Sequence, residues 1–89
     1  MKSRRTTRFH ECFAQLPSDI QSQARQAYQL FQGNPGHPGL RFKKVHQTEP
    51  IYAVRVSQGY RAVGVLKDEA IIWFWIGSHA AYDRLLSRL

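Results

Sequence analysis

The stretch Ile71–Leu89, IIWFWIGSHAAYDRLLSRL, determines how the rest of this chain folds. It begins with the apolar run Ile71–Ile76, in which every residue is β-branched or aromatic, the composition of a strand covered on both faces. Gly77-Ser78 is expected to end the strand, with Ser78 as the N-cap of a helix. Apolar residues at i, i+3, i+4 and i+7 indicate that helix, namely Tyr82, Leu85, Leu86 and Leu89. A central strand would thus present His79 at the start of a terminal helix, as part of a site or only as part of a helix cap.

Length and composition favour one globular domain, residues 1–89. The chain is 43% hydrophobic, and 13 Lys and Arg against 6 Asp and Glu give a net charge of +7. Such a balance favours a polyanion or an acidic protein as partner. The single cysteine, Cys12, excludes an internal disulfide and a Cys-based zinc site and fits a reducing cytoplasm. No apolar run approaches the roughly 18 residues of a membrane span, and no apolar segment follows the basic N-terminus as in a secretory signal.

Two helices are predicted in the first part of the chain. Residues 1–6 are expected to be a flexible basic arm, with binding to phosphate as the alternative. Thr6 or Thr7 would cap a short helix with apolar residues at Phe9, Cys12, Phe13 and Leu16. Ser18 and Gln21 have the spacing of a capping box, which would start a second helix over residues 18–32. Its buried face would hold Ile20, Ala24, Ala27, Tyr28 and Phe31. The two helices are expected to pack as a hairpin, followed by a loop at residues 33–39.

From residue 40 onward the pattern is typical of strands. A basic strand is predicted over residues 40–46, and an alternating one over 51–57 pairs with 60–66 through the two-residue turn Gln58-Gly59. The expected fold is therefore α+β: an N-terminal helix hairpin, a four-stranded antiparallel meander and a C-terminal helix.

Known cofactor motifs are absent. The sequence has no HExxH motif, no phosphate-binding glycine loop and no dinucleotide fingerprint, and its four histidines lie in four different segments. We therefore expect neither a metal nor a small-molecule cofactor.

Arg61 is the most informative charged residue. It shares a predicted strand face with Val63 and Val65, and Arg55 lies on the neighbouring strand. An arginine on a half-buried face needs an anion, and phosphate fits its geometry. The alternative is a structural salt bridge to Asp68, Glu69 or Asp83.

Two segments, Val56–Val63 (VSQGYRAV) and Trp75–Tyr82 (WIGSHAAY), together with the order of elements, resemble the RelE/ParE toxin superfamily of type II toxin–antitoxin modules. The resemblance covers nearly the whole chain. It implies a toxin that acts in the cytoplasm, inhibits translation by cleaving mRNA on the ribosome, and is bound by a cognate antitoxin. In ribonuclease members the arginine after the hairpin contacts the scissile phosphate, which corresponds to Arg61. Gly77-Ser78-His79 matches the segment of the subgroup with a C-terminal catalytic histidine.

The sequence also departs from the family pattern. RelE has two lysines on the strand before the hairpin, whereas Tyr52–Val54 has none, so Lys43 or Lys44 would have to substitute. The N-terminal strand usual in the superfamily is not evident before Phe9. ParE members inhibit DNA gyrase without ribonuclease activity, so the alternative function is a non-enzymatic gyrase inhibitor or an inactive antitoxin-binding homologue.

For cleavage, the predicted catalytic residues are Arg61, His79, Tyr82 and Asp83. His79 would act as acid or base, and Arg61, with Lys43 or Lys44, would stabilise charge on the phosphorane. Tyr82 would stack on a base or orient the phosphate, and Asp83, at i+4 from His79, would orient the imidazole. The predicted RNA-binding residues are Arg41, Lys43, Lys44 and Arg55. Both tryptophans are expected in the core.

Overall fold

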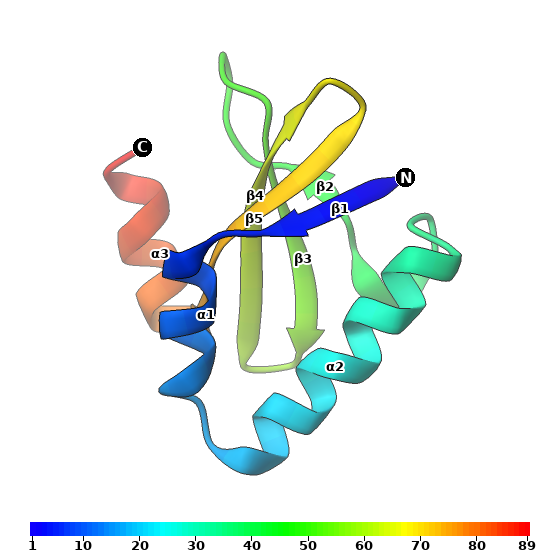
Figure 1. Cartoon of the computed structure of the whole chain (residues 1–89). Helices are drawn as coiled ribbons and strands as arrows, with labels where there is room; N and C mark the ends of the chain where they lie inside the picture. The colour runs from blue at the N-terminus through cyan, green and yellow to red at the C-terminus, as the bar shows by residue number, and fades with distance from the viewer.

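The α+β class is confirmed by the computed structural model, which describes residues 1–89 (Figure 1). Its elements are, in chain order, β1 (Lys2–Arg5), α1 (Thr7–Ala14), α2 (Ser18–Gly33), the 3₁₀ helix η1 (Pro38–Leu40), β2 (Lys43–Lys44), β3 (Ile51–Ser57), β4 (Tyr60–Lys67), β5 (Ala70–Ser78) and α3 (His79–Ser87). None of these helices has the length and apolar character needed to cross a bilayer.

The strands form one sheet in the order β1-β5-β4-β3-β2. β3 pairs with β4 antiparallel, from Ile51 opposite Val65 to Ser57 opposite Tyr60, which confirms the predicted hairpin around Gln58-Gly59. β4 pairs with β5, and β2 with β3, also antiparallel. β1, however, runs parallel to β5 on its other side, so the sheet has five strands rather than the four predicted.

The prediction of a flexible arm at residues 1–6 was wrong. The pairing of β1 runs from Lys2 opposite Ala70 to Arg5 opposite Trp73. Trp73 further fixes the segment, because its Nε1 donates a hydrogen bond to Oγ of Ser3 at 3.0 Å. Charged residues are common on edge strands, where they discourage pairing with other molecules, and a four-residue basic strand has no hydrophobic alternation to reveal it in the sequence.

The basic strand predicted over residues 40–46 is much shorter, because β2 holds only Lys43 and Lys44. Leu40 ends η1 as a core residue, and Arg41 then takes a left-handed conformation, with φ 48° and ψ 42°. The chain becomes extended only after Phe42, whose ring stacks on Tyr52 with centroids 5.0 Å apart.

The first helix begins as expected and the second does not. Oγ1 of Thr6 accepts a hydrogen bond from the backbone N–H of Phe9, which confirms Thr6 as the cap of α1. The capping box predicted for α2 is absent, because Pro17 precedes the helix and Ser18 is its first residue. The side chain of Gln21 instead donates to the carbonyl of Phe13 at 3.0 Å, which ties α2 to the end of α1.

The central strand β5 is covered on both faces, as its apolar run predicted. A bulge shifts its register against β4, so that Trp75 lies opposite Val63 and Trp73 opposite Gly64. Neighbouring residues of β4 face opposite sides of the sheet, and the bulge therefore directs the two tryptophans to opposite faces. Trp73 lies in the larger core beneath α1 and α2, and Trp75 in the smaller core beneath α3. Both are buried, as predicted, with 2% and 9% of their surfaces exposed.

The bulge allows β4 and β5 to approach closely at Gly64. A Cβ there would lie 2.9 Å from the carbonyl oxygen of Ile72 and 2.9 Å from Cε3 of Trp73. Gly64→Ala should lower the free energy of unfolding by about 1–3 kcal/mol, because the backbone oxygen cannot move without disturbing the strand pairing. Urea denaturation measures the change.

Gly59→Ala is the matched control. A Cβ at Gly59 meets nothing within 4 Å, and its φ is not positive. That variant should be unchanged or more stable by about 0.4–1 kcal/mol, through reduced freedom of the unfolded chain. Equal stability of the two variants would contradict the close approach at Gly64.

Candidate functional site

A hollow of about 240 Å³ opens on the α3 side of the sheet. Six of the eight residues predicted for the site line it: Arg41, Lys43, Arg55, Arg61, His79 and Tyr82. Ala53 and Val54 complete the lining. The hollow therefore joins Arg41, which follows η1, and the basic residues of β2, β3 and β4 to the start of α3, segments that are up to 41 residues apart in the sequence.

Strand register places the cations on one face. Lys43 lies opposite Ala53, and Arg55 lies directly opposite Arg61. Like charges facing each other across a strand pair are destabilising. None of the residues that line the hollow is acidic. Such an arrangement is expected where an external anion is bound.

Arg61 is anchored to its own hairpin rather than to a carboxylate. Its Nη1 donates to the carbonyl oxygens of Ser57 at 2.7 Å, Tyr60 at 2.9 Å and Gln58 at 3.2 Å. The salt bridge to Asp68, Glu69 or Asp83 considered as an alternative is not formed. Burial lowers the pKa of Arg61, and the charges of Arg55 and Arg41 lower it further.

His79 forms the single ion pair of the protein, with Nδ1 3.3 Å from Oδ2 of Asp83 one helical turn away. About half of the His79 side chain and most of that of Asp83 are exposed, so the pair contributes little to stability and acts mainly on the orientation of the ring. Nε2 of His79 has no protein partner. The cap of α3 is confirmed, since Oγ of Ser78 accepts from the N–H of Ala81 at 3.2 Å. The strand β5 nevertheless continues through Gly77-Ser78, so helix and strand join without the break that was predicted.

Tyr82 belongs both to the hollow and to the core beneath α3. Its ring meets that of His79 edge-on, with centroids 5.7 Å apart. Burial raises the pKa of the Tyr82 hydroxyl, although the charge of Arg61 acts in the opposite direction. The hydroxyl is therefore neutral at pH 7 and is available as a hydrogen-bond donor.

Two predicted residues do not line the hollow. Lys44 lies opposite Tyr52, whose side chain packs against the larger core, so Lys44 is on the opposite face of the sheet from Lys43. Asp83 contacts only His79 among the residues of the hollow, although its charge also acts on Arg61 and Tyr82.

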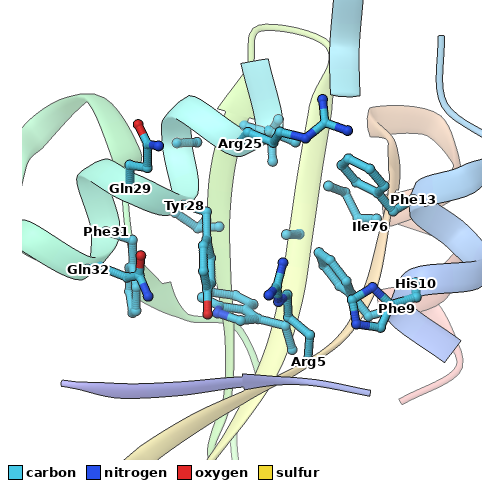
Figure 2. A pocket seen from close by; sticks show the side chains of 16 residues that line it. Arg5, Phe9, His10, Phe13, Arg25, Tyr28, Gln29, Phe31, Gln32 and Ile76 are labelled. Carbon is cyan, nitrogen blue, oxygen red and sulfur yellow. The ribbon is translucent and has the colours of Figure 1, made fainter. Parts of the chain in front are cut away.

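A second cavity, a groove of about 480 Å³ between α1 and α2, was not predicted from the sequence. The two helices diverge from their short connection (Figure 1). Aromatic side chains from both helices face the space between them, and Arg5, Arg25 and His10 lie along its margin (Figure 2). Arg5 lies over the ring of Tyr28 at 4.8 Å, and Arg25 over that of Phe13 at 5.2 Å. The lining contains no acidic residue. The signal in the sequence was the apolar face of each predicted helix, because side chains of both faces line the groove.

Comparison with known proteins agrees with this architecture. A model of the ParE-like toxin domain matches residues 18–84, about three quarters of the chain. The chain belongs to the ParE-like toxin family. No curated protein matches the sequence of this ParE-like toxin.

Solved toxin structures share the fold of the ParE-like toxin at low sequence identity. A chain of the RelB–RelE antitoxin–toxin complex from Methanococcus jannaschii superposes with a TM-score of 0.73 at 17% identity, covering 91% of this chain and 96% of that one. YafQ from Escherichia coli BL21(DE3) superposes with a TM-score of 0.72 at 12% identity, covering 91% of this chain and 96% of YafQ. The isolated RelE toxin of E. coli superposes with a TM-score of 0.64 at 18% identity, covering 98% of this chain and 96% of RelE. The resemblance to the RelE/ParE superfamily is thereby confirmed.

The opposed arginines of the ParE-like toxin lead to a prediction about stability. Arg55→Gln removes one of two like charges that face each other, and should raise the free energy of unfolding by about 0.2–1 kcal/mol. Urea denaturation at low ionic strength measures this gain, which should shrink as salt screens the repulsion.

Lys67→Gln is the control, because Lys67 lies on the neighbouring strand β4 and faces Ala70 rather than a cation. Its stability should differ little from that of the wild type. A loss of stability in Arg55→Gln would mean that Arg55 contributes to the fold rather than to the site.

Proposed function

We propose that this ParE-like toxin is a metal-independent endoribonuclease that cleaves mRNA on the ribosome and thereby inhibits translation. The observation that supports the proposal is the hollow itself, in which four cations without carboxylate partners surround a histidine held by an aspartate. An anion-binding site beside a titratable group fits the cleavage of a phosphodiester.

RNA supplies its own nucleophile. The 2′-oxygen attacks the adjacent phosphorus, a P–O bond forms to that oxygen, and the bond to the 5′-oxygen breaks. The products are a 2′,3′-cyclic phosphate and a free 5′-hydroxyl. One proton must leave the 2′-hydroxyl and another must reach the departing oxygen, so the protein has to orient the nucleotide, move protons and stabilise charge.

The residues of the hollow suit these tasks. Nε2 of His79, free of protein partners, would move one proton, while Asp83 fixes the ring through Nδ1. The guanidinium of Arg61 would stabilise the phosphorane, and the neutral hydroxyl of Tyr82 would donate a hydrogen bond to a phosphate oxygen. Arg41, Lys43 and Arg55 would hold the flanking phosphates.

Replacement of His79 separates an enzyme from a binder. His79→Gln should reduce the rate of mRNA cleavage by roughly 10²-fold or more, because glutamine cannot transfer the proton. Binding to RNA or ribosomes should change little, since phosphate contacts dominate such an interface. Arg61→Ala should impair both cleavage and binding, with the larger loss in the rate of cleavage. Mapping of mRNA 5′ ends after induction measures cleavage, co-sedimentation with ribosomes measures binding, and thermal melts verify folding.

Full toxicity of His79→Gln with intact messages would contradict the ribonuclease function. The same cells, tested for gyrase-dependent DNA breaks, would then show whether the protein acts instead as a non-enzymatic gyrase inhibitor.

We further propose that a cognate antitoxin binds the protein through an acidic segment over the hollow and an amphipathic helix in the groove between α1 and α2. The groove offers aromatic side chains, and its margin carries Arg5 and Arg25 (Figure 2). The RelB–RelE complex from M. jannaschii pairs a toxin of this fold with an antitoxin. A helix with one apolar face and flanking carboxylates would match both features of the groove.

Binding of the antitoxin should weaken as salt is raised, because the net charge of +7 attracts an acidic partner. The product of the adjacent reading frame, measured by calorimetry or surface plasmon resonance, is the appropriate probe. Arg25→Glu should weaken binding by roughly tenfold or more, since a like charge opposes the partner at the margin of the groove.

Lys67→Glu makes the same charge change on β4, at a residue that lines neither the groove nor the hollow, and should have a smaller effect. An affinity that does not depend on salt, or equal effects of the two variants, would contradict this mode of binding.

A further inference from the structure

The turn between β3 and β4 directs four consecutive carbonyl groups at two residues of the site. Those of Ser57, Gln58 and Tyr60 accept hydrogen bonds from Nη1 of Arg61. The remaining one, of Gly59, accepts from the backbone N–H of His79 at 2.8 Å. The turn thus connects the arginine of β4 to the first residue of α3.

The hydrogen bonds leave part of the guanidinium free. Nη1 carries two of the five N–H donors of an arginine, and these two are shared among three carbonyl oxygens. The donors on Nε and Nη2 have no protein partner. The edge formed by Nε and Nη2 can bind two oxygens of one phosphate in parallel, which is the strongest geometry for this pair of groups.

We propose that the turn Ser57–Tyr60 is the positioning element of the site: its carbonyls fix Arg61 relative to His79, so that the Nε–Nη2 edge of Arg61 receives the phosphate. The inference rests on the proposed ribonuclease function and specifies how that site is held ready. The length of the turn, rather than its side chains, determines the arrangement.

Fixing the Arg61 side chain before the substrate binds reduces the conformational entropy that must be lost during the reaction. An arginine side chain loses about 1.5–2 kcal/mol of rotamer freedom when it is ordered, which corresponds to about 10- to 30-fold in rate if the ordering must accompany the reaction. Here the three carbonyls order Arg61 before any substrate arrives. They also offset the burial and the like charges of Arg55 and Arg41 that act against its positive charge.

One inserted glycine tests the turn. A glycine added between Gln58 and Gly59 moves the carbonyls away from Nη1 and from the N–H of His79. It should reduce kcat for RNA cleavage by about 10- to 30-fold and change KM less than threefold. The matched control is a glycine inserted between Asp68 and Glu69, in the turn that joins the other ends of β4 and β5. That variant, and Gln58→Ala, should keep the wild-type kcat.

Arg61→Lys provides a second test without altering the backbone. An ammonium has three N–H donors, which the three carbonyls would occupy, leaving none for phosphate. The variant should keep wild-type stability and lose kcat by about tenfold or more. If Arg61 only stabilised the hairpin, Arg61→Lys and the insertion at Gln58 would change the melting temperature but not kcat, which would overturn the inference.

NMR gives a measurement that does not depend on cleavage. In the wild type, rotation about the Cζ–Nη1 bond of Arg61 should be slow, with distinct Hη signals, and the amide of His79 should resist hydrogen exchange. Both properties should be lost with the insertion at Gln58 and kept with the insertion at Asp68.

Free rotation in the wild type, or an insertion at Gln58 that leaves kcat unchanged, would overturn the positioning role while the ribonuclease function stands. A wild-type protein that leaves RNA intact would overturn the ribonuclease function, and the NMR comparison would then decide by itself whether the turn holds the two residues.

Discussion

The strand β5 pairs with β1 on one side and β4 on the other, and both of its faces are buried. The helical layers on the two sides of the sheet depend on this double burial, because β5 contributes side chains to both cores. An ordinary strand would direct Trp73 and Trp75 to the same face, and one side of the sheet would lack its largest side chain. The bulge against Val63 and Gly64 resolves the conflict, because it gives each core one tryptophan. An 89-residue chain can therefore support helices on both sides of a single sheet.

The same strand determines where the candidate site lies. β5 ends at Ser78, which caps α3, so the end of a rigid central strand places His79 beside the β3–β4 turn. Arg55 and Arg61 are therefore held on paired strands and His79 and Tyr82 on a helix that continues directly from β5, which favours fixed geometry. Tyr82 and Asp83 act from about one turn further along the helix.

The positive charges that would favour binding of an anion in the hollow lower the stability of the folded protein. The folded protein places Arg55 opposite Arg61 and adds Arg41 and Lys43 without a carboxylate, although each contact between like charges opposes folding. The backbone carbonyls of the turn compensate in part, since they stabilise the guanidinium of Arg61 without neutralising it. Positive charge therefore remains available for a phosphate or for the carboxylates of a protein partner, which agrees with both proposed interactions.

The sequence by itself determined the α+β class, the span of α2, the β3–β4 hairpin and the double burial of β5, because each depends on local periodicity or turn chemistry. It also indicated six of the residues that line the hollow, since hairpin register and a helix cap bring Arg61 and His79 to the same end of the sheet, but it did not show that Lys44 lies on the other face. Tertiary structure decided the rest. β1 forms by pairing with the edge of β5 that β4 leaves open. β2 is short because Leu40, just before it, is buried in the core. Arg61 donates hydrogen bonds to backbone carbonyls instead of to a carboxylate. These outcomes depend on contacts between distant segments or on backbone groups, which side-chain patterns do not encode.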